Sequence, residues 1–198
     1  MPTDTRERLV DAGADLFRLQ GFAGTGINAI LAAAHAQFSS LYHHFPGGKD
    51  ELAEEVIRTT GAAYQELVRA TWDQADDVVL GVQSVFDGAA AVLEATDYAD
   101  ACPIATVALE VASTNERLRV ATADVFGAWV LGATLKFTEV GVSAGEARRL
   151  ALSVIALLEG SFILARATKD TEPVRAAGRT AVDAVRLVLG ASGHRPDA

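Results

Sequence analysis

Several side chains that can form hydrogen bonds lie within a stretch of seven residues near the N-terminus. Amide, hydroxyl and imidazole groups can bond to phosphate oxygens or to the edges of bases. The stretch has no Lys or Arg, so its contacts are expected to be hydrogen-bonded or apolar rather than ionic. The side chains are Gln37, Ser39, Ser40, Tyr42 and His43.

The residue patterns on which most enzymes depend are missing from this sequence. His43 and His44 are adjacent, so on a helix their side chains point about 100° apart, which disfavours a shared metal ion. Ser161 lies in Glu-Gly-Ser-Phe, which is not a nucleophile elbow. There is no glycine-rich phosphate loop, no His-Glu-x-x-His and no cysteine pair. We expect no enzymatic activity, no metal and no cofactor.

Cysteine occurs once, at Cys102, directly before Pro103 at the start of a predicted helix. A thiol in that position can have a lowered pKa and respond to oxidants. The alternative is that Cys102 is a small buried apolar residue, which we favour.

Apolar residues recur at spacings of three and four along the chain, and period-2 alternation never persists, so we predict an all-α fold. Gly21 should end the first helix, Thr25 should be the N-cap of the second, and Ser143 that of the eighth. The predicted helices span 5–20, 27–33, 37–43, 49–71, 77–95, 103–112, 115–140, 144–167 and 173–189.

Residues 26–45 have the length of a helix-turn-helix, in which the second helix enters the DNA major groove and the first crosses the backbone. Periodicity alone is weak evidence for this motif, because two short helices with a turn occur in many proteins. The apolar residues expected to hold the two short helices against Leu16 and Phe17 are Ile27, Ile30, Leu31, Ala34, Leu41 and Phe45.

The charge of the chain is distributed unevenly. It has 198 residues and a net charge of −9, of which −1 falls in residues 1–50 and −8 in residues 51–198. This excludes a general nucleic-acid coat protein, which would be basic. We find no apolar run that indicates a secretory signal and no uncharged stretch long enough to span a membrane, so we expect a cytoplasmic protein without a membrane partner.

The exact residues resemble the TetR family of bacterial transcriptional repressors over about the first 52 positions. The similar segments are Thr5-Arg-Glu-Arg-Leu-Val-Asp-Ala, Leu16-Phe17, Gly21-Phe22, Thr25, Ser40-Leu-Tyr-His-His-Phe45 and Gly48-Lys-Asp-Glu-Leu52. The segment Cys102-Pro-Ile-Ala-Thr-Val-Ala-Leu-Glu110 resembles the subgroup that controls drug-efflux genes.

This resemblance implies a homodimer that binds a palindromic operator in double-stranded DNA and releases it when a small hydrophobic effector binds. It places a three-helix, helix-turn-helix DNA-binding domain in residues 1–50 and a helical ligand-binding and dimerisation domain in residues 51–198. Thr25, Ser40, Tyr42, His43 and Lys49 match positions that contact DNA in the family.

Three positions depart from the family pattern. His35 replaces the turn glycine, so a left-handed backbone there would be strained. Gln37 stands where a small cap is usual and could bond to adenine, whereas Phe38 replaces a common lysine and could contact a thymine methyl. The second helix therefore cannot form an Arg–guanine pair. These departures leave open an alternative function, a helical protein that binds small molecules and has weak or lost DNA recognition.

Aromatic residues in the second part of the chain either form its core or line a ligand pocket. A helical bundle rich in small residues can leave a cavity between its large side chains. Because residues 51–198 carry a net −8, we expect a neutral or cationic, flat and largely hydrophobic effector. The candidate ligand-binding residues are Phe86, Cys102, Phe126, Trp129 and Phe162.

The last two predicted helices carry stripes of small and apolar residues that either pack in their own core or form the dimer interface. The resemblance favours the interface, as a four-helix bundle of two helices from each chain. The stripes are Ala147, Leu150, Ala151, Val154, Leu158, Ser161 and Ala165, and Val174, Ala177, Gly178, Ala181, Val185 and Val188.

Overall fold

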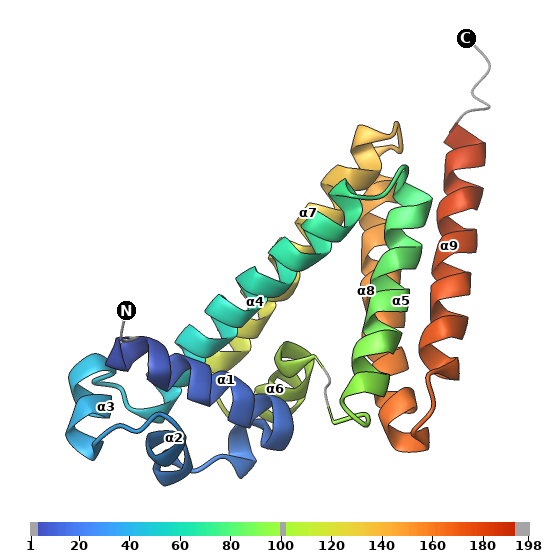
Figure 1. Ribbon diagram of the computed structural model, residues 1–198. Coiled ribbons are helices and arrows are strands. Elements are labelled where there is room, and N and C mark those ends of the chain that lie inside the picture. The colour runs from blue at the N-terminus through green and yellow to red at the C-terminus, as the bar shows by residue number, and fades with distance from the viewer. Residues whose placement is uncertain (1–3, 100–101, 193–198) are drawn as a thin grey trace. The chain divides into compact units, whose positions relative to one another are not determined.

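The computed structural model describes residues 4–99 and 102–192, and within them the fold is all-helical (Figure 1). This confirms the predicted fold class. Each predicted helix is present, and the largest difference in an end is at the first helix. The helices are α1 (Thr5–Gly24), α2 (Ile27–Ala33), α3 (Phe38–His44), α4 (Lys49–Asp73), α5 (Val78–Ala95), α6 (Pro103–Val111), α7 (Glu116–Glu139), α8 (Ala144–Thr168) and α9 (Glu172–Ser192).

The chain divides into two compact units. One comprises Met1–Ala63 and Cys102–Phe126, and the other comprises Tyr64–Ala101 and Gly127–Ala198. The division falls within α4 and within α7. The first unit therefore holds α6 and the start of α7 as well as the N-terminal helices, while a functional boundary at residue 50 stays a prediction.

The first unit packs α2 and α3 onto α1. Five of the apolar residues expected to do this are buried, namely Ile30, Leu31, Ala34, Leu41 and Phe45, together with Phe17 of α1. Ile27 and Leu16 are half-buried. In the same unit α4 approaches α7 closely at Gly61, where a Cβ atom would overlap the side chain of Val125.

The end of α1 is more complex than a simple stop at Gly21. Gly21 has φ 73° and ψ 177°, which interrupts the helix, and the chain then makes a further turn to Gly24. A side chain at Gly21 would overlap the carboxylate of Glu110 in α6. Glu110 Oε2 accepts a hydrogen bond from Ala23 N at 2.8 Å, so α6 holds this extra turn in place.

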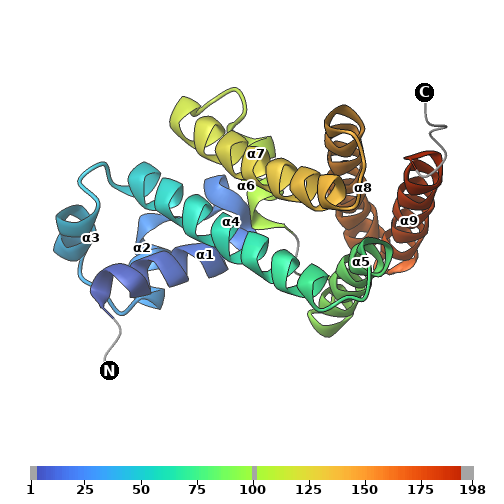
Figure 2. The same cartoon turned by 90° about the horizontal axis from the view of Figure 1, so that it is seen from above.

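The second unit is built around α9, which lies beside α5 and α8 (Figure 2). Phe86 and Leu93 of α5 and Phe137 of α7 belong to its buried core. Gly178 lets α9 approach α5, because a Cβ atom there would be 2.9 Å from Cβ of Phe86.

The predicted interface stripes are wrong, because most of their residues belong to this core. Ala147, Ala151, Ala165, Val174, Ala181 and Val185 are fully buried within the chain, and Leu150, Val154, Ser161 and Gly178 are buried as well. A helix that packs on its own domain has the same small-residue periodicity as one that packs on a second copy. The residues of α8 and α9 that remain free for a partner lie on their other faces.

Three helices, α5, α7 and α8, are long and apolar enough to cross a membrane, by length and composition only. The expectation concerned uncharged stretches, and each of these helices contains charged residues. Val78–Ala95, for example, contains only Asp87 and Glu94 as charged residues along its 18 residues.

Candidate nucleic-acid interface

The connection into α2 differs from the prediction at Thr25. The N-cap is Gly26, and Thr25 is buried, with its hydroxyl donating to Gly21 O at 2.7 Å. Thr25 therefore stabilises the end of α1 instead of capping α2. Its burial leaves no exposed hydroxyl for a DNA phosphate.

The turn between α2 and α3 keeps a left-handed residue although it has no glycine. His35 has φ 48°, a conformation that costs a residue with a Cβ atom about 1–2 kcal/mol. The turn is fixed by a hydrogen bond from Ala36 N to Leu31 O at 2.9 Å. Arg8 of α1 also donates from Nε to Ala34 O at 3.0 Å, which satisfies a carbonyl at the end of α2.

The exposed face of α3 and its N-cap carries most of the side chains that the sequence selected. Leu41 and, directly after the helix, Phe45 point inward and are buried. His44 is half-buried, with its ring 4.9 Å from that of His43. Ser40 is half-buried, and the exposed residues are Gln37, Phe38, Ser39, Tyr42 and His43.

Lys49 makes contacts within the chain. Its Nζ donates to Phe22 O at 2.6 Å and lies 4.0 Å from the centre of the Phe22 ring. Partial burial lowers the pKa of Lys49, against the opposing effect of Asp50 and Glu110. Lys49 thus joins the start of α4 to the end of α1, and its contact with phosphate stays a prediction.

Three residues that position this surface were missed by the sequence analysis. Arg8 supports the turn, Glu110 holds the end of α1, and Gly48 lies against the Tyr42 ring. Gly48 was noted only as part of the segment Gly48–Leu52 that resembles the family. Glu110 is 87 residues from Ala23, and no local pattern shows such a contact.

The five candidate ligand-binding residues are divided between the two units. Cys102 is the N-cap of α6 in the first unit, where its Sγ accepts from Ala105 N at 3.4 Å, and Phe126 belongs to the same unit. Cys102 is buried. In the second unit Phe86 is buried, while Phe162 and Trp129 are half-buried. Their role in binding a ligand stays a prediction.

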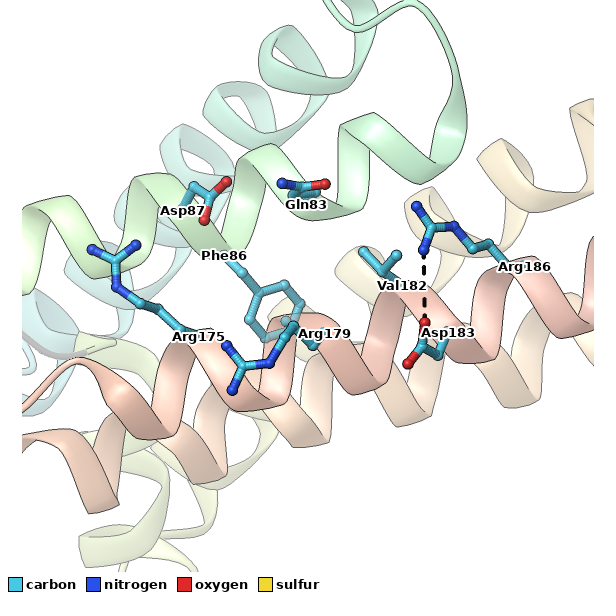
Figure 3. Close-up of a pocket in the computed structure, with 9 residues that line it drawn as sticks. Gln83, Phe86, Asp87, Arg175, Arg179, Val182, Asp183 and Arg186 are labelled. Atoms are coloured by element: carbon cyan, nitrogen blue, oxygen red, sulfur yellow. Dashed lines mark ion pairs between the residues drawn. The ribbon is translucent and has the colours of Figure 1, made fainter.

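A groove of about 370 Å³ lies between α5 and α9 (Figure 3). Of the five candidates, Phe86 lines it. The groove is otherwise rich in charged side chains, including Arg175, Arg179 and Arg186 of α9 and Asp87 of α5. It is therefore a poor match for the mainly apolar pocket that the sequence suggested.

Sequence comparison identifies the family to which this arrangement belongs. The profile of bacterial regulatory proteins of the tetR family matches residues 9–56. The profile of the transcriptional regulator LmrA/YxaF-like C-terminal domain matches residues 79–180, about half of the chain. This chain belongs to the TetR family. It is a transcriptional regulator with a DNA-binding helix-turn-helix, and α3 stands in the place of the recognition helix of this motif.

Two curated relatives and two solved structures show how far the TetR likeness extends. The chain is 33% identical to the regulator YxaF of Bacillus subtilis, over 86% of this chain and 90% of that one. It is 29% identical to LmrA of the same organism, over 86% and 91%. A TetR regulator from Chloroflexus aurantiacus has a TM-score of 0.76 at 28% identity, covering 92% and 94%. A TetR protein from Rhodobacter sphaeroides has a TM-score of 0.80 at 20% identity, covering 90% and 97%.

Proposed function

We propose that this protein is a cytoplasmic repressor that binds a palindromic operator as a homodimer and is released by a small hydrophobic effector. The observation that carries the proposal is the exposed face of α3, which presents hydrogen-bonding and aromatic side chains on a helix-turn-helix. Helix-turn-helix dimers bind two half-sites about one helical turn apart, so the two-fold symmetry of the dimer is matched by a palindrome.

The dimer in this proposal uses the outer faces of α8 and α9. These faces carry exposed apolar side chains next to small residues, which allow helices from two chains to approach closely. Ile163 is 61% exposed and Leu187 is 76% exposed. The other exposed residues of the α8 face are Leu152, Ala156, Gly160 and Ala167.

The effector in this proposal is neutral or cationic and largely hydrophobic. Residues 51–198 carry a net −8, which opposes an anionic ligand. The segment Cys102–Glu110, which resembles the subgroup that controls drug-efflux genes, supports a drug-like or plant-aromatic compound and a regulated efflux gene. To release DNA, the compound must bind the DNA-incompetent state more tightly.

Trp129 fluorescence provides the test for an effector, with Trp72→Phe removing the second tryptophan. An inducer should change the emission of Trp129, and the protein should bind it more weakly when operator is present. The factor by which operator lowers the affinity for the inducer should equal the factor by which the inducer lowers the affinity for operator. A compound that binds equally with and without operator would refute induction by that compound.

One observation favours the alternative of a helical protein that binds small molecules without reading DNA. The segment from Gln37 to His44 has no Lys or Arg to contact phosphates. Incubating the purified protein with fragments of its source genome and sequencing those it retains separates the two functions. We expect a few fragments that share a palindrome. Enrichment of none, or of fragments without a shared site, would support the alternative.

A further inference from the structure

The recognition helix carries an exposed aromatic pair. Phe38, the first residue of α3, is 58% exposed, and Tyr42, one turn later, is 42% exposed. Their ring centres are 5.1 Å apart with an angle of 50° between the planes. Both rings are exposed, although Leu41, which lies between them in the sequence, is buried.

The loop that follows α3 contacts the Tyr42 ring of this pair. Gly48 has φ 66°, and a Cβ atom at this position would lie 3.3 Å from Cε1 of Tyr42. The backbone of the loop therefore lies close to the Tyr42 ring, and Tyr42 in turn supports Phe38. Contacts of this kind restrict the side-chain rotamers before any partner binds, which lowers the entropy lost on binding.

The chemistry of the pair limits what it can recognise on DNA. A phenyl ring has no hydrogen-bond donor or acceptor, so Phe38 cannot contact a phosphate or the polar edge of a base in a specific way. The C5-methyl group of thymine is the apolar feature of the major groove. In a helix-turn-helix the N-terminal residues of the recognition helix contact base edges, and Phe38 is the first residue of α3.

We propose that Phe38, supported by Tyr42, reads the C5-methyl group of a thymine in each operator half-site. This inference rests on the proposed function, since it requires operator binding through α3. It assigns to Phe38 a role in specificity that a lysine in this place could not have, because a lysine would contact phosphates or guanine. The alternative for an exposed aromatic pair is a contact with another protein, in which case methyl groups on DNA have no influence.

The experiment replaces single thymines of the operator by 2′-deoxyuridine, which removes the methyl group and leaves the hydrogen-bonding edge unchanged. The operator is the palindrome found by fragment selection, and affinity is measured by fluorescence anisotropy. At one thymine per half-site we expect the substitution to weaken binding about fourfold, or about 15-fold when both half-sites are changed. Fourfold corresponds to about 0.8 kcal/mol, the free energy of burying one methyl-sized group.

Phe38→Ala tests whether this residue is the reader. Because Phe38 is exposed in the free protein, the variant should fold, which circular dichroism verifies. We expect Phe38→Ala to bind the thymine and deoxyuridine operators with equal affinity. Removal of the methyl group then weakens binding only when the Phe38 ring is present, which is the coupling expected of two groups in contact. Leu19→Ala, which shortens an exposed apolar residue of α1, is the matched control and should keep the full deoxyuridine effect.

The results separate failure of this inference from failure of the proposed function. If the protein binds its operator but no deoxyuridine substitution weakens binding, methyl readout is wrong and operator binding stands. If the deoxyuridine effect persists in Phe38→Ala, another side chain reads the methyl group. If the wild-type protein retains no genomic fragment, both the function and this inference are overturned.

Discussion

Single residues fix the backbone geometry around the recognition helix. Gly21, Arg8 and His35 act at the end of α1 and in the turn before α3. The sequence predicted a stop at Gly21 from residue type and the strain at His35 from the missing glycine. It could not show that Arg8 supports this turn or that Glu110 holds the end of α1, because both contacts join residues distant in sequence.

His35→Gly should increase stability. Glycine adopts the left-handed conformation without the strain of a Cβ atom, although it costs more entropy on folding, so we expect a gain of up to about 1 kcal/mol. Urea unfolding followed by circular dichroism measures it. His35→Ala is the control, since it keeps the Cβ atom, and should be no more stable than the wild type. Equal stabilisation by both variants would contradict the strain at this turn.

At the scale of the helices, the sequence predicted the structure best. Periodicity located each helix, because apolar residues at three- and four-residue spacing must face something. It could not say what they face. For Ala147 and Ala181 both a core and an interface position were open and the resemblance favoured the interface, whereas the structure buries both in their own unit. Exposure in the folded chain, as at Ile163, separates the two cases.

Ile163→Glu should therefore give a monomer. A glutamate in the α8 and α9 interface would be buried without a partner, which costs several kcal/mol. Helicity should be kept because Ile163 is exposed in the single chain, and light scattering reports the mass. Val92→Glu, at an exposed apolar position of α5, should remain a dimer. Ala181→Glu should instead unfold the second unit. A dimeric Ile163→Glu variant would place the interface elsewhere.

The contact between α4 and α7 in the first unit should depend on pH. Glu54 accepts hydrogen bonds from Arg117 and Arg58, and these bonds lower the pKa of Glu54 from 4.5, with Arg117 contributing most. The folded state thus favours the charged carboxylate. The hydrogen bonds to the charged Glu54 therefore stabilise the folded state above pH 4.5. This stabilisation is lost as the pH falls through the pKa that Glu54 has in the folded state, which is below 4.5.

Glu54→Gln should reduce the free energy of unfolding by about 1 kcal/mol near neutral pH, the upper range for an exposed ion pair. The difference from the wild type should shrink as the pH falls below 4.5. Urea unfolding at several pH values measures it, with Glu66→Gln as a control in which an exposed pair within one helix is changed. A difference that does not vary with pH would contradict a role for the charge of Glu54.

At the scale of the whole molecule, the net charge of −9 works against DNA binding. The chain offsets this by keeping residues 1–50 near neutrality and by leaving α3 without any charged residue of either sign except its histidines. Recognition must then depend on hydrogen bonds and apolar contacts more than on ion pairs. We expect a weak dependence of affinity on salt, because few cations can displace counterions from the phosphates.

The central claim is that the exposed face of α3 binds DNA, and one comparison tests it directly. Ser39→Glu adds a negative charge to that face, and Ser84→Glu makes the same change on an exposed position of α5. Genomic fragments retained by each purified variant are sequenced beside those of the wild type. Ser84→Glu should retain the same palindromic fragments as the wild type, and Ser39→Glu should retain none of them. Retention of the same fragments by Ser39→Glu would show that α3 is not the surface that meets DNA.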